Sequence, residues 1–437
     1  MIILNEIGAT NPKFEIRNPQ SEGRRVLGNF FSLSIVQFAN YLAPVIILPY
    51  LFRVLGRDRY GLTELARAVS VYFLILTDYG FSLSATQEIS VHRDDPQRVS
   101  EVFSSVMLLK SLLVIFSALV LSLLVLAVPK FRAEWAVYFL SFGNVIGMWL
   151  FPIWLFQGLE RMKYIPLLNV TAKTLVIISV FLVIQGPNDY VYAPLLQSAG
   201  TILIGLAGLI LAVWKFRVRF RLPSFEVLTR ELAHGWHIFL SKAAITLYTT
   251  SNIVILGLLT NNAFVAYYAA GDKIIRAATD GLHIPLSQAI FPHIGQLAAR
   301  SRPAALHFAA RVAQLLSLAT LVISAGVFLA APYIARILLG AESAGSVSVI
   351  RILSPLPFVV GWSNIFGFQV MVNFGLKRLL ARIFLAAGVL NIALAVLLAL
   401  PLQQAGVALA SLTTEVVVTT ATFLALRKNG LHLFRDL

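Results

Sequence analysis

The stretch LLVIFSALVLSLLVLAV, residues 112–128, decides the fold class, because apolar side chains cover every face of it. An α-helix of about 20 such residues crosses the roughly 30 Å hydrocarbon core of a bilayer. Transmembrane β-strands would instead appear as short runs of alternating polar and apolar residues. The stretch therefore predicts a membrane-spanning helix and excludes a β-barrel.

The composition of the whole chain supports the same class. The 437 residues are 58% hydrophobic and only 13% charged, and the mean hydropathy is +0.81. Soluble domains are about 45–50% apolar and about 25% charged. We therefore expect an all-α integral membrane protein with about twelve transmembrane helices. The expected spans are residues 26–52, 63–85, 101–128, 134–157, 165–185, 191–215, 236–260, 264–291, 306–331, 347–373, 379–400 and 405–426.

A polar stretch near the middle of the chain, residues 215–231, separates six expected spans from six. The sequences that follow the first and seventh spans, residues 51–69 and 256–274, share an apolar end, a short polar turn and a helix start rich in aromatic and small residues. Repeats of this kind enclose a central site in many transporters. We expect two six-helix lobes. Their predicted limits are a tail (1–25), an N-lobe (26–215), a linker (216–233), a C-lobe (234–427) and a second tail (428–437).

The net charge of +15 follows from basic residues scattered over short loops. This distribution is typical of the positive-inside rule and does not favour nucleic-acid binding. The opposite loops, around residues 186–190, 261–262 and 403–404, contain no Lys or Arg, so both termini are predicted to be cytoplasmic. Arg53, Arg57 and Arg59 are the exception. Either they weaken the topology locally, or they serve at an outer gate.

Charged residues inside apolar spans are the main functional signal, because a charge at mid-bilayer costs at least a few kcal/mol. Asp272, Lys273, Arg276, Asp280 and His283 share one face of the eighth expected span. Asp272 and Arg276 are also spaced as a helical ion pair. The stripe is either self-neutralised packing or the lining of a cavity that meets substrate or a coupling ion.

Further candidates lie on other expected spans. In the seventh, Lys242 shares a face with Thr246 and Thr249 and is the best single candidate for contact with an anion. Snorkelling of the lysine to the membrane surface is the alternative. Other predicted contacts of the substrate are Asn40, Arg67, Lys110 and Lys173, and the candidates for binding a coupling ion are Asp78, Asp272 and Asp280.

Several kinds of site are not expected. The chain has no cysteine, so disulfides and thiolate metal sites are excluded, and its seven histidines lack the spacing of a metal site. No GxxxxGK[ST] motif for nucleotide binding occurs. We predict no cofactor; a proton, a sodium ion or the membrane potential would supply the energy.

The sequence PIWLFQGLERMKYIP, residues 152–166, contains Pro152, Trp154, Gln157, Gly158 and Glu160 in the spacing PxWxxQGxExxxY. It resembles the signature of the Wzx-type polysaccharide flippases of bacterial inner membranes. Three further stretches resemble that family in the same order. They are YLFRVLGRDRYGL (50–62), TDYGFSLSATQEIS (77–90) and YYAAGDKIIRA with PLSQAIFPHI (267–294).

The resemblance implies the multidrug, oligosaccharidyl-lipid and polysaccharide exporter superfamily. It also implies two six-helix lobes in a V-shaped arrangement, with a cleft between them that opens alternately to either side of the membrane. It implies a polyprenyl-pyrophosphate-linked oligosaccharide as cargo and places the protein in O-antigen or lipopolysaccharide biosynthesis. A polysaccharide polymerase and other assembly proteins are its expected partners, besides membrane lipid. Two alternatives stay open: a cation-coupled multidrug antiporter of the same superfamily, and a membrane glycosyltransferase or polymerase. We expect a flippase and not an enzyme, because the predicted external loops are too short to carry a catalytic site.

Overall fold

The computed structural model describes the main chain of residues 19–433 and the side chains of residues 44–433 apart from Ser241 and Tyr248. Every regular element in this range is a helix, as predicted. The first half contains α1 (Pro19–Asp78), α2 (Phe81–Val91), α3 (Pro96–Ala127), α4 (Pro129–Ala133), α5 (Trp135–Leu150), α6 (Ile153–Gly158), α7 (Tyr164–Val183), η1 (Pro187–Val191) and α8 (Tyr192–Trp214). The second half contains α9 (Phe225–Leu259), α10 (Asn262–Arg300), α11 (Arg302–Leu339), η2 (Ala341–Ser343), α12 (Ala344–Leu353), α13 (Leu356–Ser363), a π-helical segment η3 (Asn364–Met371) and α14 (Lys377–Lys428).

Eight helices in the described range are long and apolar enough to cross a membrane, or nine if the bent α9 is one span. Two of the eight are longer than a bilayer requires and contain a break. The break in α1 is at Gly56 (φ 70°, ψ 168°), and that in α14 is at Gln403 (φ 52°, ψ −131°). The charged helix α10 is not among the eight. The protein thus spans the membrane many times, and the count of twelve stays a prediction.

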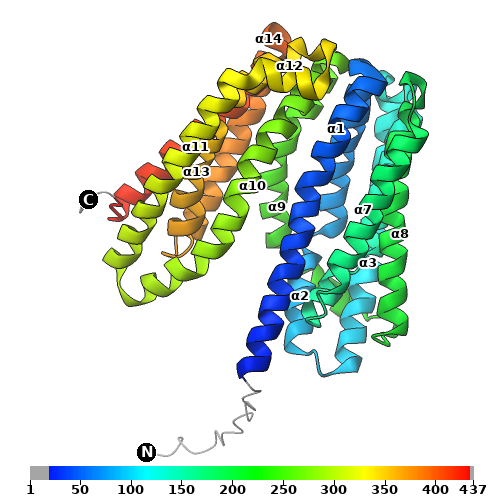
Figure 1. Cartoon of the computed structure of the whole chain (residues 1–437). Coiled ribbons are helices and arrows are strands. Elements are labelled where there is room, and N and C mark those ends of the chain that lie inside the picture. The colour runs from blue at the N-terminus through cyan, green and yellow to red at the C-terminus, as the bar shows by residue number, and fades with distance from the viewer. Residues whose placement is uncertain (1–18, 434–437) are drawn as a thin grey trace, which may run out of the picture.

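The helices form two bundles, as expected for a two-lobed transporter. Figure 1 shows α1–α8 on one side and α10–α14 on the other, close together at the top of the view and diverging toward the bottom, where the described chain begins. Glycines allow the close approach at the top. A Cβ atom on Gly61 of α1 would lie 1.8 Å from the main-chain oxygen of Asn262, at the start of α10. Main chain therefore meets main chain where the bundles touch.

Helix α9 belongs to both bundles. Its first half packs on α2, where Gly235 approaches Gly80 and Phe239 stacks on Tyr79 with ring centroids 5.0 Å apart. Its second half packs against α14. Between Leu247 and Thr249 the helix bends by 51°. The predicted start of the C-lobe at residue 234 stays a prediction, because α9 packs against both bundles and no single residue divides it between them.

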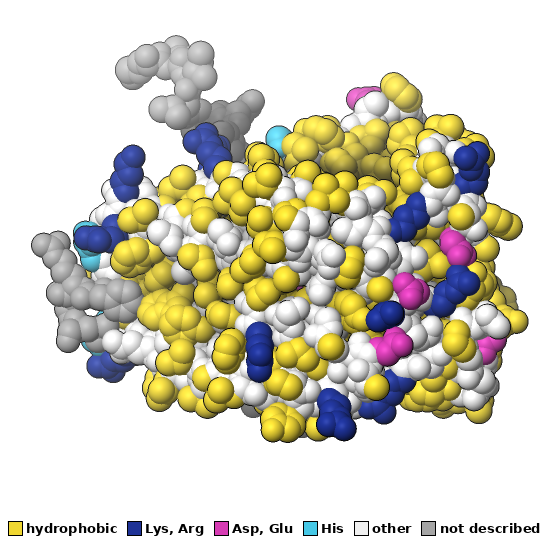
Figure 2. All heavy atoms as spheres, turned by 90° about the horizontal axis from the view of Figure 1, so that it is seen from above, with side chains coloured by type: hydrophobic (Ala, Val, Ile, Leu, Met, Phe, Trp, Pro, Cys, Tyr) yellow, Lys and Arg dark blue, Asp and Glu magenta, His cyan; other side chains and the backbone are white. Residues whose placement is uncertain are grey.

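Apolar side chains face outward along the helices. On α3, Leu112, Phe116, Leu119 and Leu123 are 53–66% exposed. In water this would be unfavourable, but a lipid-facing helix exposes such side chains to hydrocarbon. Seen from the end at which the bundles meet, the surface is filled by side chains, and basic and acidic groups alternate on one half of it (Figure 2).

Candidate functional site

Three adjoining cavities run between and into the two bundles. The central cavity, of about 310 Å³, has α1 on one side and α9 and α10 on the other. The N-lobe cavity, of about 250 Å³, extends from it among α1, α7 and α8, and shares Arg67 and Lys273 with it. The C-lobe cavity, of about 100 Å³, adjoins the opposite end and shares Arg276 and Asp280. The bundles therefore enclose a crevice that reaches into both.

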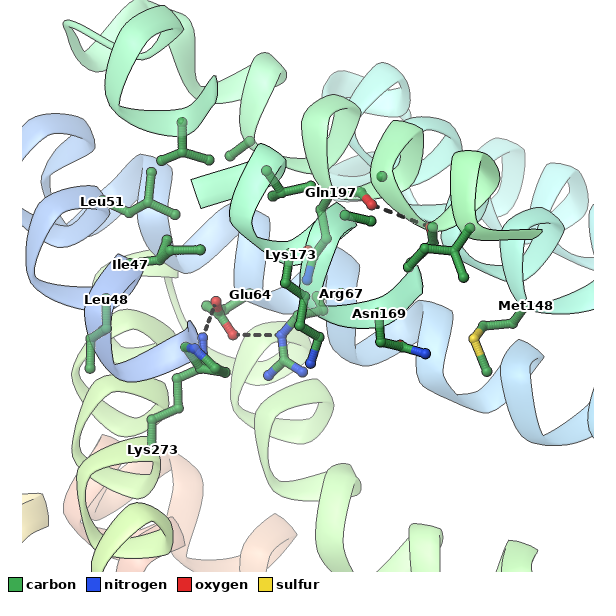
Figure 3. Close-up of a pocket in the computed structure, with 18 of the residues that line it drawn as sticks. Ile47, Leu48, Leu51, Glu64, Arg67, Met148, Asn169, Lys173, Gln197 and Lys273 are labelled. Carbon is green, nitrogen blue, oxygen red and sulfur yellow. Dashed lines mark hydrogen bonds and ion pairs between the residues drawn. The ribbon is translucent and has the colours of Figure 1, made fainter. Parts of the chain in front are cut away.

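The carboxylate of Glu64 holds two of the predicted cations. It accepts from Lys273 Nζ through Oε1 over 2.5 Å and from Arg67 Nε through Oε2 over 2.9 Å. Lys273 also donates to the hydroxyl of Tyr60 over 3.1 Å. Glu64 and Arg67 belong to α1 and Lys273 to α10, so this network joins the two bundles (Figure 3).

On α10, Arg276 and Asp272 form the helical ion pair that their spacing predicts, with Nε and Oδ2 2.7 Å apart. Both also line the central cavity. The charged face of α10 is consequently neutralised in part by its own ion pair and also lines a cavity. The two interpretations of this face, self-neutralised packing and cavity lining, are therefore compatible. Asp280, one turn further along, makes no ion pair or hydrogen bond with any residue that the structure describes.

Lys242, the best candidate from the sequence, pairs with an acidic residue of the other half of the chain. Its Nζ lies 2.7 Å from Asp78 Oδ2, and the other oxygen of this carboxylate, Oδ1, accepts from the hydroxyl of Ser82. The buried Lys110 interacts electrostatically with Asp78 and lines none of the three cavities. Asp78 is thus held between cations at a distance from the central cavity.

The remaining candidates are divided by the bend in α9. Thr249 lines the central cavity, whereas Thr246, on the other side of the bend, lines none of the three cavities. Lys173 lines the N-lobe cavity beside the amides of Asn169 and Gln197 (Figure 3). The side chain of Asn40 lies outside the part of the chain whose side chains are described.

The signature residues lie away from these cavities and fasten α6 to α2. The amide oxygen of Gln157 accepts from the hydroxyl of Thr86 over 3.3 Å. A Cβ atom on Gly158 would lie 2.6 Å from the side chain of Ile89, so only glycine permits this packing. Trp154, in the first turn of α6, is fully buried in an apolar cluster, and Pro152 directly precedes this helix. Glu160 pairs with Arg93 over 2.7 Å. The signature therefore has a packing role in this structure.

Cations also join the bundles at the end where they touch, which we call the outer end. Arg57 donates to the hydroxyl of Tyr267 on α10 over 2.9 Å, and Arg53 donates to the main-chain oxygen of Ile337 on α11. Arg59, in contrast, stays within the first bundle, where it pairs with Glu134 over 2.8 Å. Two of the three arginines that violate the positive-inside pattern thus bridge the bundles.

A third bridge at the outer end comes from Lys130 of α4. Its Nζ donates to the main-chain oxygens of Gly257 over 2.5 Å and Thr260 over 3.0 Å. These carbonyls belong to the last turn of α9, where a helix leaves oxygens without partners and carries partial negative charge. Burial lowers the pKa of the Lys130 ammonium group from its ordinary value, so part of this attraction offsets lost hydration.

Two contributors to the site were not predicted. Glu415 of α14 lines the C-lobe cavity with Asp280, Thr279 and Ser411. Its position in a long apolar span is a signal of the same kind as Asp272. Lys130 lies in a short connection between spans, where the cost of burying a charge in lipid gives no signal.

The sequence of residues 26–298 matches the model of a family described as "Polysaccharide biosynthesis protein". This chain belongs to that family. The resemblance to Wzx-type polysaccharide flippases is thereby confirmed. The signature at residues 152–164 lies inside the matched region.

Two curated relatives align with almost the whole of this chain. A protein of Escherichia coli (strain K12) named "Putative O-antigen transporter" is 31% identical over 403 residues, which cover 92% of this chain and 97% of the relative. A protein of the same name from Shigella dysenteriae is 29% identical over 394 residues, covering 89% and 97%. The relatives are thus named as transporters and not as enzymes.

Solved structures share the fold at low sequence identity. A multidrug resistance MATE family transporter of the MOP superfamily, in an inward-facing conformation, superposes with a TM-score of 0.67 at 15% identity, covering 90% of this chain and 99% of the other. The lipid II flippase MurJ, in an inward closed conformation, gives 0.66 at 12% identity, covering 92% and 87%. These likenesses confirm the two-lobed transporter fold.

Proposed function

We propose that this protein is a flippase that moves a polyprenyl-pyrophosphate-linked oligosaccharide across the bacterial inner membrane by alternating access. The single observation that carries the proposal is the cavity between the bundles, lined by cations of both. A family that serves polysaccharide biosynthesis and relatives named as O-antigen transporters support this class of cargo.

The cations of the cavities recognise the pyrophosphate. The central and N-lobe cavities together are lined by four cations, Arg67, Lys173, Lys273 and Arg276, and by three carboxylates, Glu64, Asp272 and Asp280. A pyrophosphate that leaves water needs replacement of its hydration by charged donors, and guanidinium groups supply paired donors to phosphate oxygens. The excess of cations is small, so the bound anion must compete with carboxylates of the protein.

Glu64 is the carboxylate with which the pyrophosphate competes first. It occupies Arg67 and Lys273 in the absence of cargo and keeps two buried cations paired, which avoids the large penalty of an unpaired buried charge. On binding, phosphate oxygens take its place on these donors. Because Arg67 and Lys273 belong to different bundles, this exchange alters a contact between the bundles and couples binding to their movement.

The sugar and the lipid occupy different surroundings. The amides of Asn169 and Gln197 and the hydroxyl of Thr201 line the N-lobe cavity next to Lys173 and are suited to hydrogen bonds with sugar hydroxyls. The polyprenyl chain stays in hydrocarbon beside the bundles, where apolar helices face outward. The cargo thus crosses with only its polar part in the crevice.

The bridges at the outer end hold that end closed while the crevice opens toward the other. We place both termini in the cytoplasm, so the crevice loads from the cytoplasmic leaflet and the outer end faces the periplasm. Release requires Arg53, Arg57 and Lys130 to leave their partners on the second bundle. These three residues form an outer gate.

The proposed site for the coupling ion is the C-lobe cavity. Asp78 and Asp272 are occupied by Lys242 and Arg276, whereas Asp280 forms no ion pair or hydrogen bond with any residue that the structure describes. Glu415 lines the same cavity as Asp280. A proton or a sodium ion is the coupling ion suited to carboxylates and hydroxyls in a small cavity. The membrane potential would add to this by acting on the charges directly.

The test is transport of lipid-linked oligosaccharide into the outer leaflet of proteoliposomes, with the protein oriented and its amount determined. Arg276→Ala and Arg67→Gln should each slow translocation, whereas replacement of Lys377, an exposed cation at the start of α14, by glutamine should not. Unchanged translocation in both cavity variants would refute the assignment of the cavity. A polysaccharide polymerase that receives the translocated unit is the expected partner on the periplasmic side.

A further inference from the structure

A fourth cavity lies at the end of the first bundle opposite the outer gate. It has a volume of about 410 Å³ and shares no lining residue with the three cavities of the crevice. Its walls come from the turn between α2 and α3, the turn between α6 and α7, and the segment that follows α8. We call it the end cavity.

Three cations from these three segments line the end cavity: Arg93, Arg161 and Lys215. Glu160 neutralises Arg93 over 2.7 Å. Arg161 forms no ion pair with any residue that the structure describes, and Lys215 lies over the ring of Tyr164 at 5.2 Å and hydrogen-bonds to its side chain. Two cations in one cavity therefore lack a carboxylate partner among the described residues, and Asp94 is the acidic lining residue not engaged by Arg93.

The turns that carry these cations are fixed by unusual main-chain conformations. Glu160 and Arg217 both have left-handed φ angles, 54° and 53°, which residues other than glycine adopt rarely. The first turn is closed by a hydrogen bond from the amide of Arg161 to the oxygen of Phe156 over 2.8 Å. The second is closed by a bond from the amide of Val218 to the oxygen of Ala212 over 3.3 Å. The signature residues that fasten α6 to α2 thus also fix one wall of the end cavity.

The surroundings of the end cavity mark it as a membrane interface. The segment after α8 carries four cations at residues 215, 217, 219 and 221, with the exposed Phe220 (58%) among them. Exposed apolar side chains flank this run: Trp214 (80% exposed) at the end of α8, Leu222 (85%), and Phe225 (81%) at the start of α9. Aromatic and basic residues alternate in this way where a protein meets lipid headgroups. Inside the cavity, Val99 and Phe216 supply an apolar wall next to Arg161 and Lys215. A free anion would contact only the cations, whereas a phospholipid would contact the cations with its phosphate and the apolar wall with its hydrocarbon part.

We propose that the end cavity binds the phosphate headgroup of an anionic phospholipid, with Arg161 and Lys215 as its ligands. The apolar wall, Val99 and Phe216, contacts the beginning of the acyl chains. This site is independent of the crevice and of the proposed cargo. The signature turn at Glu160 thereby has a second role besides packing. The pairing of Glu160 with Arg93 positions Arg161 in the lipid site.

The experiment is native mass spectrometry of the full chain, released from detergent with phosphatidylglycerol or phosphatidylcholine added. Each cation near the headgroup should contribute about fivefold to the affinity, so Arg161→Gln with Lys215→Gln should weaken binding of phosphatidylglycerol roughly 25-fold. The matched control is Lys377→Gln with Arg378→Gln, which removes the same charge from exposed positions on the second bundle. Asp94→Asn, which removes the competing carboxylate, should strengthen binding.

Selective loss of phosphatidylglycerol in the cavity variant, with the control unchanged, would support the site. Equal binding by wild type and cavity variant, equal weakening by the control, or equal affinity for phosphatidylcholine would each overturn it. Inorganic pyrophosphate serves as a competitor: displacement of the lipid at low concentration would show a free-anion site and overturn the assignment to phospholipid. None of these outcomes depends on whether the protein transports lipid-linked sugar.

Discussion

Replacing Lys130 by methionine should open the outer end. Methionine keeps the length and unbranched shape of the side chain and removes its charge and donors. The two main-chain oxygens on the last turn of α9, those of Gly257 and Thr260, then lose their partner from the first bundle. Every other bridge at this end stays in place, so the variant isolates one part of the proposed gate.

The size of the effect follows from the geometry. Hydrogen bonds to a charged donor contribute about 1.5–3 kcal/mol each, but the half-buried ammonium group of Lys130 gives up part of its hydration to make them. A net loss of about 1.5 kcal/mol from the outer-closed state is therefore expected. This corresponds to about a tenfold change in the ratio of outer-closed to outer-open molecules.

The absence of cysteine from the sequence makes the measurement direct. Spin labels on Asn188→Cys and Ala344→Cys, both exposed near the outer end of different bundles, report the distance between the bundles by pulsed EPR. Lys130→Met should add a population at longer distance. Arg59→Met is the matched control, since Arg59 pairs only with Glu134 and the ring of Tyr190 within the first bundle. If the two variants give the same distribution as the parent, the gate does not depend on Lys130.

Three other outcomes are expected. Glu64→Gln leaves Arg67 and Lys273 without their carboxylate and should lower the stability of the protein by about 3 kcal/mol, measured as thermal unfolding in detergent; an unchanged midpoint would contradict the network. Gly61→Val forces a side chain against the main chain at the bundle contact and should favour the outer-open population in the same EPR assay, whereas an unaltered distribution would show that the contact can relax. Asp280→Asn with Glu415→Gln should make transport insensitive to the pH and sodium gradients, and retained dependence on either gradient would remove the C-lobe cavity from coupling.

Sequence periodicity predicted the parts of the site that lie within one helix. The pairing of Asp272 with Arg276 follows from a spacing of four residues, and their shared face explains why both line the cavity. Contacts between distant helices carry no such signal. The partner of Lys242 is Asp78, 164 residues away, and the bend in α9 separates Thr246 from the cavity that Thr249 lines.

The cost of placing a charge in lipid singles out charged residues inside membrane spans and gives no signal for residues outside them. It identified Lys273 and Arg276, and it applied equally to Glu415, which the sequence analysis overlooked. This cost gives no signal for Lys130, because that residue lies in the short helix α4, between two expected spans. The loop arginines were noticed for a different reason, their conflict with the positive-inside rule, and two of the three do join the bundles.

The double membership of α9 limits how the molecule can move. The first half of this helix is anchored by stacking of Phe239 on Tyr79, just before α2. Its second half packs between the bundles, on α14 and on α1, where a Cβ atom on Gly257 would lie 2.5 Å from the side chain of Leu65. In the alternating access proposed above, a change in the angle between the bundles would therefore twist or straighten the main chain at the bend between Leu247 and Thr249. The stiffness of that short stretch would then limit how far the crevice opens, and hence the size of the headgroup that it admits.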